Sequence, residues 1–260
     1  MKVLILDTAE AAIDRSATIL LDVVRRKPAS VLGLATGGTM LPLYDRVVSR
    51  HAAEGVSFAG VTTFNLDEYI GLGPDHIGSY HHYMRKALFD RIDIDIRLTH
   101  LPRGDAPDPT AEAEAYERRI EAAGGIDLQL LGIGRNGHIG FNEPTSSLAS
   151  RTRIKTLTDD TRQANRAYFD SLADTPRFAI TMGVGTILAT RACLLLATGA
   201  AKAPAVARMI EGPVSAACPA TALQLHRQVT VVLDRAAAAE LSLRDYYEHI
   251  HPNGAESDFG

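Results

Sequence analysis

The chain has 260 residues, of which 46% are hydrophobic and 22% charged, and its formal net charge is −4. This length and composition suit one large α/β domain with a sizeable core. The net negative charge disfavours a general affinity for nucleic acid or for an anionic membrane. The apolar run 3–6 is too short for a signal-peptide core, and no stretch approaches the roughly 20 apolar residues of a membrane span. The two cysteines, Cys193 and Cys218, lack the spacing of a zinc site or a redox pair, which favours a reduced, cytoplasmic setting.

Short apolar runs alternate with helical patterns from the N-terminus onward. The first predicted helix has Ile13, Ala17, Leu20 and Val24 on one face. The predicted strands are 3–6, 31–35, 61–65, 126–133, 178–182, 192–197 and 229–233. Further helices are predicted after the loop 36–39, over 110–123 and 202–210, and from the start given by 235–241. The alternation predicts a doubly wound, mostly parallel sheet with helices on both faces, in one domain over 1–250 with a flexible tail over 251–260.

Four loops that directly follow predicted strands carry unusual residues. They are 36–39, 67–69, 134–143 and 199–202. In open α/β sheets, ligands bind at the carboxyl ends of the strands. The shared position of the four loops therefore predicts one common site.

The first and last of these loops have features of a phosphate site. Gly37 and Gly38 let the backbone approach a ligand, and Thr39 adds a hydroxyl where a helix begins. Lys202 begins another predicted helix and can pair with a phosphate as a point charge. The first loop is neither a Walker loop nor a dinucleotide fingerprint. An ordinary tight turn and a solvated lysine are the alternative readings.

Asp67 and Glu68 close the third predicted strand, and a carboxylate there can serve as a general base. Helix capping is the alternative role for such residues. The segment 132–144 contains four glycines in nine residues, which implies unusual backbone angles. Within it, His138 and Glu143 can form an imidazole–carboxylate pair for proton transfer near neutral pH. A structural histidine is the alternative, and no spacing here supports a metal site.

The segment 146–155 carries three cations and several hydroxyls, which suits either a second anion site or a solvated basic strand. With these loops assembled, the chain resembles the glucosamine-6-phosphate deaminase (glucosamine-6-phosphate isomerase) family along nearly its whole length. The matching segments are LATGGT (34–39), VTTFNLDEYIGL (61–72), LLGIGRNGHIGFNEPTSSLASRTRIKTLT (130–158), ITMGVGTIL (180–188) and TALQLH (221–226).

The resemblance implies a Rossmann-like fold without a nucleotide cofactor or metal. It implies conversion of glucosamine 6-phosphate and water to fructose 6-phosphate and ammonia, in amino-sugar breakdown. Asp67 would be the base that moves a proton from C2 to C1 of the open-chain sugar, and His138, supported by Glu143, would assist ring opening. The phosphate would be held by Gly37, Gly38, Thr39 and Lys202.

Two positions depart from some members of the family. Asn136 stands where those members have an aspartate that completes a carboxylate–histidine–carboxylate set, and an amide can orient His138 only by hydrogen bonding. Ala167 stands where some members have a lid arginine that reaches the phosphate. Arg166 is its neighbour and a candidate substitute.

The resemblance also implies regulation and assembly. In allosterically activated, hexameric members, a segment like 146–155 binds N-acetylglucosamine 6-phosphate between subunits. The residues here that correspond to it are Ser146, Ser147, Arg153 and Lys155. The sequence therefore predicts a homohexamer with this activator site.

Three competing functions differ in chemistry. A 6-phosphogluconolactonase shares the fold but hydrolyses a lactone, and the intact segments around Asp67 and His138 favour the deaminase. A non-catalytic sugar-phosphate sensor would bind ligand without needing the base, and the retention of Asp67, His138 and Glu143 together disfavours it. An NAD-dependent oxidoreductase is disfavoured because the dinucleotide fingerprint is absent from the sequence.

Overall fold

The computed structural model describes residues 1–164, 166, 169, 171 and 174–255. Its strands are β1 (Lys2–Leu6), β2 (Val31–Leu34), β3 (Thr62–Asn65), β4 (Asp67–Tyr69), β5 (Thr99–His100), β6 (Leu128–Leu131), β7 (Arg153–Thr156), β8 (Phe178–Thr181), β9 (Cys193–Ala197) and β10 (Val229–Asp234). Its α-helices are α1 (Ala9–Arg26), α2 (Met40–Glu54), α3 (Tyr80–Ala87), α4 (Pro109–Ala122), α5 (Asp159–Ala164), α6 (Val184–Leu188), α7 (Ala203–Glu211) and α8 (Arg244–Ile250). Short 3₁₀ helices occupy Phe89–Arg91, Ile96–Leu98, Ala200–Lys202, Pro219–Leu225 and Pro252–Gly254.

The strands form two sheets. Seven parallel strands make the main sheet in the order β1-β10-β9-β6-β2-β3-β5. The central strands β2, β6 and β9 are buried along their whole length, as expected for parallel strands covered on both faces. The predicted doubly wound, mostly parallel fold is therefore confirmed.

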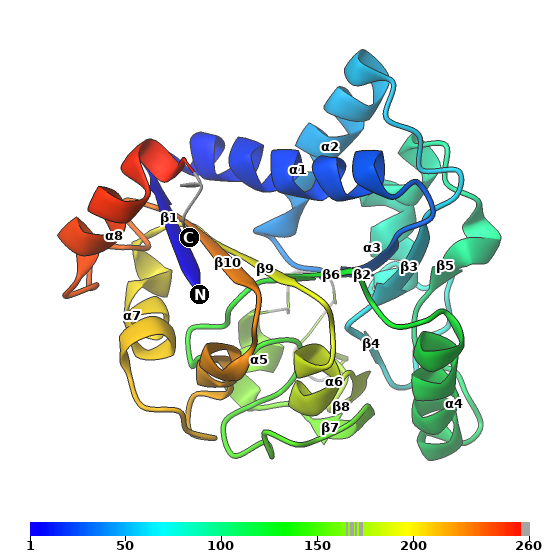
Figure 1. Cartoon of the computed structure of the whole chain (residues 1–260). Coiled ribbons are helices and arrows are strands. Elements are labelled where there is room, and N and C mark those ends of the chain that lie inside the picture. Colours follow the sequence, from blue (N-terminus) through cyan, green and yellow to red (C-terminus); the bar gives the residue numbers. More distant parts are fainter. Residues whose placement is uncertain (165, 167–168, 170, 172–173, 256–260) are drawn as a thin grey trace.

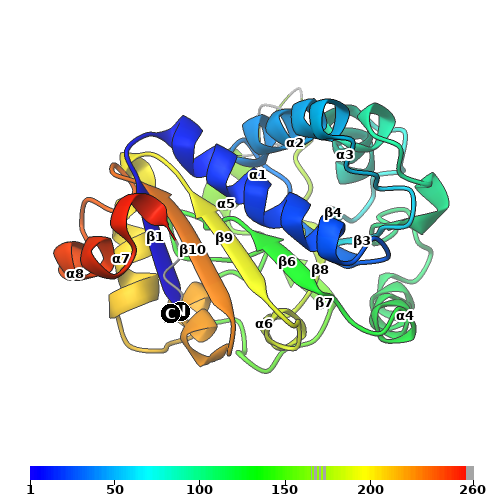
Figure 2. The same ribbon diagram turned by 45° about the horizontal axis from the view of Figure 1, so that its top comes forward.

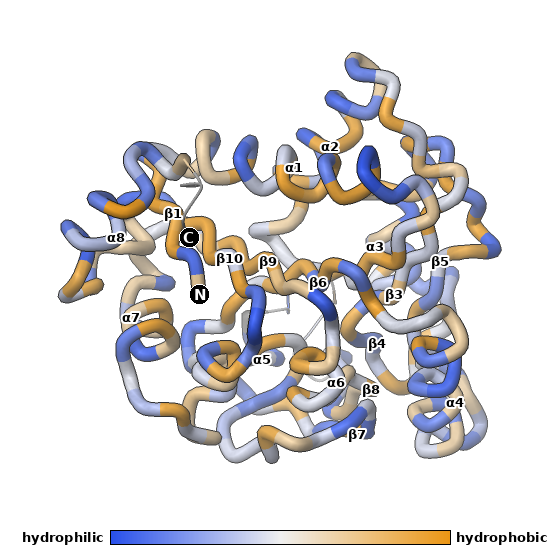
Figure 3. Tube along the Cα trace, in the orientation of Figure 1, coloured by the Kyte–Doolittle hydropathy of each residue, from blue (hydrophilic) through white to orange (hydrophobic). Residues whose placement is uncertain are grey.

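Helices cover both faces of the main sheet (Figure 1). One face carries α1 and α2, while α5, α6 and the smaller sheet lie on the other. Figure 2 shows α1 lying over one face of the main sheet and running alongside its strands, in agreement with its contacts to β1, β9 and β10. Along α1 and α4 the hydrophilic and hydrophobic colours alternate (Figure 3), as amphipathic helices on a sheet require.

Capping side chains explain where helices α1 and α4 begin. The Thr8 hydroxyl accepts a hydrogen bond from the Ala11 amide at the start of α1, and the Asp108 carboxylate accepts from the Thr110 and Ala111 amides at the start of α4. These side chains satisfy amides that have no partner within the helix. Pro109 then occupies the first turn of α4, where its missing N–H costs nothing.

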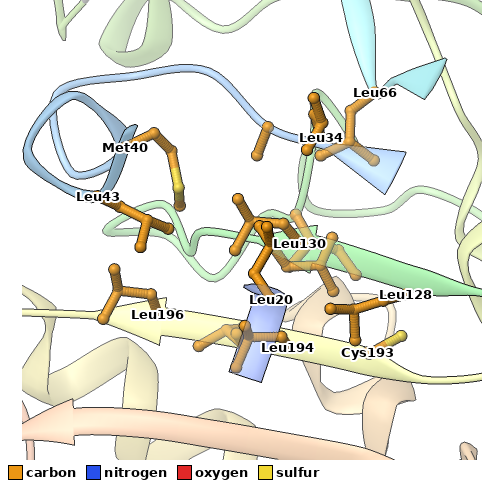
Figure 4. Packing of buried hydrophobic residues seen from close by; sticks show 14 of the residues in the cluster. Leu20, Leu34, Met40, Leu43, Leu66, Leu128, Leu130, Cys193, Leu194 and Leu196 are labelled. Carbon is orange, nitrogen blue, oxygen red and sulfur yellow. The ribbon is translucent and has the colours of Figure 1, made fainter. Parts of the chain in front are cut away.

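One cluster of buried hydrophobic residues reaches from β1 to β10. Figure 4 shows part of it around β6 and β9, with Leu20 of α1, Leu130 and Leu194 among its fully or almost fully buried members. This packed layer holds the carboxyl ends of the central strands in fixed positions, and these ends carry the predicted functional loops.

The smaller sheet differs from the sequence prediction. The segment 178–182 was expected to join the mostly parallel sheet, but β8 pairs antiparallel with both β4 and β7. The chain leaves the main sheet at Leu66, whose amide donates to the Leu34 carbonyl and whose carbonyl accepts from the Met182 amide. Asp67 consequently starts a strand of the small sheet instead of ending a strand of the main sheet.

The prediction of a helix that begins within 235–241 is also wrong. This segment forms turns, and α8 begins only at Arg244. The Glu211 carboxylate accepts hydrogen bonds from the Ser242 and Leu243 amides and so holds the chain in a bend. An alanine-rich stretch has high helix propensity, but here tertiary hydrogen bonds decide its conformation.

The sequence assigned residues 251–260 to a tail outside the domain. Residues 252–254 pack against β1 in the structure, and His251 is only 5% exposed. A Cβ atom at Gly254 would lie 2.6 Å from a Leu6 methyl group. Residues 256–260 of the predicted flexible tail lie outside the described residues.

Candidate active site

A cleft of about 470 Å³ lies at the carboxyl ends of β2, β3, β6 and β9. It brings together six of the eight residues predicted for catalysis and phosphate binding: Gly37, Gly38, Thr39, Asp67, His138 and Lys202. Asn136 and Glu143 lie directly behind His138. The cleft also has lining residues that the sequence analysis did not single out, among them Tyr80, Arg135, Asp160 and Thr161.

The loop after β2 has an exposed, unfilled concave side. Gly37 has φ +112°, a backbone conformation that side chains disfavour, and a Cβ atom at Gly37 or Gly38 would meet no heavy atom within 4 Å. Thr39 precedes α2 without making a capping hydrogen bond, which leaves the helix start available to an anion. The Tyr83 hydroxyl donates to the Gly37 carbonyl at 2.8 Å and holds the loop in place from α3.

Lys202 supplies positive charge to the same cleft. Its Nζ donates to the Ile133 carbonyl at 2.8 Å, which draws the side chain toward the loop after β6. Burial, and then the positive charge of Arg135, lower the pKa of Lys202. An anion bound beside both cations would relieve their mutual repulsion.

Asp67 is a buried carboxyl group at the inner wall of the cleft. It is 5% exposed, and burial together with the neighbouring Glu68 charge raises its pKa to about 8. Hydrogen bonds from the Phe141 amide and the Thr181 hydroxyl act in the opposite direction. A carboxyl group with a pKa in this range can accept and return a proton near neutral pH.

Glu68 has a structural role, although it neighbours Asp67. Its fully buried carboxylate accepts hydrogen bonds from the amides of Tyr69, Tyr80 and His81, and it lies 2.9 Å from the His81 ring. It therefore satisfies the first amides of α3 and does not line the cleft. Of the two carboxylates that the sequence offered as a base, only Asp67 faces the ligand space.

The Glu143 carboxylate lies beside the His138 ring. Glu143 Oε2 lies 3.5 Å from His138 Nδ1 and accepts a hydrogen bond from Asn136 Nδ2 at 2.8 Å. Burial acts to raise the pKa of Glu143, but the nearby His138 imidazole and hydrogen bonds from Thr161 and Asn136 outweigh it and lower the pKa to about 2. Glu143 is therefore ionised at neutral pH.

Asn136 contributes in a different way from the one expected. Its Oδ1 accepts a hydrogen bond from the backbone amide of His138 at 3.2 Å, and its Nδ2 donates a hydrogen bond to the Glu143 carboxylate. The amide thus orients the carboxylate and the loop backbone, and acts on the imidazole through Glu143.

Two glycines of the 132–144 segment are required by close contacts. A Cβ atom at Gly134 would lie 2.3–2.5 Å from three atoms of the His138 ring. A Cβ atom at Gly140, which has φ +54°, would lie 3.3 Å from Asp67 Oδ2. The glycines therefore let the loop backbone pack directly against both groups with acid–base chemistry.

The residues of the predicted activator site do not line the cleft. Ser146 is buried and donates to the Glu143 carbonyl at 2.6 Å, while Arg153 Nη1 donates to Asn142 Oδ1 at 2.8 Å. Ser147 is exposed and Lys155 is half-buried. Arg166 is exposed and is not among the described residues that line the cleft, and Ala167 lies outside the described residues.

Two further properties concern metals and membranes. Among the residues that the structure describes, no group of three or more His, Cys, Asp and Glu side chains is arranged to hold a metal ion. In the same part of the chain, no helix has both the length and the apolar character needed to cross a bilayer. Cys193 and Cys218 are buried and unpaired, and burial raises the pKa of Cys193 to about 11.

A glycine loop with an open helix start and side chains able to exchange protons meet here on the carboxyl edge of an α/β sheet. This combination is typical of α/β enzymes that act on small anionic substrates.

The chain belongs to the glucosamine-6-phosphate isomerase/6-phosphogluconolactonase family, whose model matches residues 6–232. It is 55% identical to glucosamine-6-phosphate deaminase of Shewanella loihica over 251 residues, which cover 96% of this chain and 93% of the relative. It is 54% identical to the deaminase of Hahella chejuensis, with 96% and 95% of the two chains covered.

Solved structures agree with this assignment. A monomeric glucosamine-6-phosphate deaminase superposes with a TM-score of 0.90 at 48% identity, covering 92% of this chain and all of that one. The 6-phosphogluconolactonase of Trypanosoma brucei has a TM-score of 0.76 at 19% identity, covering 93% of this chain and 98% of that one. The second likeness shows a shared fold alone.

Proposed function

We propose that this chain is an enzyme that converts glucosamine 6-phosphate and water to fructose 6-phosphate and ammonia. Full-length identity of 50–55% to deaminases carries the choice of reaction. The observation that carries the chemistry is Asp67, a buried carboxyl group with a pKa of about 8 that faces the same cleft as an anion-binding loop.

In the proposed mechanism, the substrate phosphate lies against Gly37, Gly38 and Thr39, with Lys202 as counter-charge. Ionised Asp67 removes the proton from C2 of the open-chain sugar and delivers it to C1. The C2 amine then forms an imine, which water hydrolyses to the ketone and ammonia. Atoms balance without an added oxidant or reductant.

His138 assists the opening of the pyranose ring in this mechanism. The Glu143 carboxylate beside Nδ1 favours the tautomer that carries its proton on Nδ1, which leaves Nε2 free to accept a proton from the anomeric hydroxyl. Because Glu143 is also bound by Thr158 and Thr161, its position is fixed from α5 as well as from Asn136.

The function is tested by incubating the purified chain with glucosamine 6-phosphate and measuring ammonia and fructose 6-phosphate. Equal release of the two products is expected. Hydrolysis of 6-phosphogluconolactone without ammonia release would support the lactonase instead. Calorimetric binding of glucosamine 6-phosphate with no turnover of either substrate would support the sensor.

The pH dependence of catalysis follows from Asp67. Since the ionised carboxylate is the base, kcat/KM should rise with pH, reach half of its maximum near pH 8, where burial places the pKa of this group, and level off about one pH unit higher. The same shift affects folding: Asp67 holds its proton in the folded chain far above the ordinary pKa of 3.8, so its contribution to stability is full below about pH 4 and is lost as pH rises through about 8. A pH series of initial rates and of thermal midpoints measures both, and a plateau reached already at pH 5 would contradict the assignment.

A cytoplasmic homohexamer activated by N-acetylglucosamine 6-phosphate stays a second proposal, which rests on the resemblance of residues 146–155. Exposed Ser147 and half-buried Lys155 are available to such a ligand, whereas Ser146 and Arg153 already serve contacts within the chain. A solved relative described as monomeric favours the opposite outcome.

Light scattering gives the mass, and saturation curves with and without the activator give the regulation. A hexamer whose half-saturating substrate concentration falls with activator supports the proposal. A monomer with an unchanged curve refutes it and leaves Ser146 and Arg153 with the structural contacts described above.

A further inference from the structure

Arg135 is a cation at the mouth of the cleft, between Gly134 and Asn136 in the glycine-rich segment. It lines the same cleft as Lys202 and the loop of Gly37 and Gly38. Its guanidinium group contacts Asp160 at 3.0 Å, and both side chains are about 60% exposed, at 59% and 61%. The Arg208 side chain donates to the Arg135 carbonyl and holds the backbone at this point.

The charge of Arg135 acts on Lys202 inside the cleft. Burial is the main cause that lowers the pKa of Lys202, and the charge of Arg135 adds to it. A sugar phosphate carries between one and two negative charges at pH 7, whereas Lys202 supplies one positive charge. A second cation would complete the neutralisation, and Arg135 lines the same cleft as Lys202.

Asp160 is a weak competitor for Arg135. An ion pair this exposed contributes little to stability, because water screens it and two flexible side chains must be ordered to form it. A phosphate accepts two parallel hydrogen bonds from a guanidinium group and carries more charge than a carboxylate. Exchange of Asp160 for a bound phosphate is therefore favourable.

We propose that Arg135 is a phosphate-binding residue that leaves Asp160 and pairs with the phosphate of the substrate when the substrate enters. This inference rests on the proposed function and adds a specificity-determining residue to it. It also assigns the second phosphate cation to the glycine-rich loop and not to Arg166, which is exposed and not among the described residues lining the cleft.

The test compares Arg135→Gln and Asp160→Asn, with inorganic phosphate as the probe in calorimetry and glucosamine 6-phosphate in steady-state kinetics. Arg135→Gln should raise the Kd for phosphate and the KM for substrate by about tenfold to a hundredfold, the usual loss for a charged hydrogen bond, and leave kcat within about threefold. Asp160→Asn should leave both constants unchanged or lower them by about twofold, since a competing and repelling carboxylate is gone.

The two variants should change the Kd for phosphate in opposite directions, and this distinguishes phosphate binding by Arg135 from a structural role of the ion pair. If the ion pair only held the loop to α5, both variants would weaken phosphate binding alike, and that result would overturn the proposal. Wild-type phosphate affinity in Arg135→Gln, or its loss in Arg166→Gln instead, would overturn it as well. Arg85→Gln is the matched control, because Arg85 is 57% exposed, pairs with Asp90 and does not line the cleft.

Calorimetry keeps this inference distinct from the proposed function. An enzyme that releases no ammonia but loses phosphate affinity in Arg135→Gln would refute the deaminase and retain the binding role. Normal turnover together with unchanged phosphate affinity in Arg135→Gln would retain the deaminase function and refute the binding role of Arg135.

Discussion

Replacing Asp67 with asparagine should reduce kcat by roughly a thousandfold or more, because the variant lacks the base that moves the proton between C2 and C1. The folded chain should become more stable at the same time. Asparagine has the shape of aspartate but no charge to bury, so above pH 8 the thermal midpoint should rise by roughly 5 °C. Ammonia release and a thermal melt at pH 8.5 measure the two effects.

Glu68→Gln is the matched control for this experiment, since it removes the charge of the neighbouring buried carboxylate. Glu68 accepts three amide hydrogen bonds at the start of α3, so its loss should lower stability. It also removes a charge that raises the pKa of Asp67, so the plateau of kcat/KM should shift to lower pH. Asp67→Asn with near wild-type ammonia release would rule out Asp67 as the base.

Replacing Gly134 with alanine should reduce kcat by about a hundredfold while leaving the chain folded. The added methyl group would lie 2.3–2.5 Å from the His138 ring, so the ring must move, and displacement of a catalytic group by about 1 Å costs this much. The ring is 21% exposed and borders the open cleft, so it can move aside without unfolding the core.

Kinetics and a thermal melt of Gly134→Ala are compared with those of Gly73→Ala. A Cβ atom at Gly73 meets no heavy atom within 4 Å and Gly73 does not have a positive φ, so this variant should match the wild type. Full activity in Gly134→Ala would show that the position of the His138 ring does not limit the reaction.

Much of the main sheet could be predicted from the sequence, because buried parallel strands appear as uninterrupted apolar runs. The strands β2, β6 and β9 lie within the predicted ranges. The small sheet could not be assigned in this way. Its strands β4, β7 and β8 are three or four residues long, and their antiparallel pairing depends on the turn of the chain at Leu66, which has no local signature.

The same distinction applies to the site. The glycines, His138 and Asp67 were identifiable because they come shortly after strands of the main sheet. The different roles of Asp67 and Glu68 could not be predicted, because the position of α3 decides which carboxylate accepts the amide hydrogen bonds at the start of that helix. Tyr80 and Thr161 reach the cleft from α3 and α5, and no sequence spacing links them to it.

The turn at Leu66 divides the proposed machinery between two sheets. The groups proposed to hold the phosphate stand on loops after β2, β6 and β9 of the main sheet, whereas Asp67 belongs to β4 of the small sheet. The two sheets are joined by the Leu66 hydrogen bonds to Leu34 and Met182, so their separation is set by the fold. In the proposed mechanism the fold therefore fixes the distance between the phosphate site and the base, and so selects the length of the carbon chain between the phosphate and C2. A phosphorylated sugar that is one carbon shorter could bind by its phosphate, but its reactive proton would not reach Asp67.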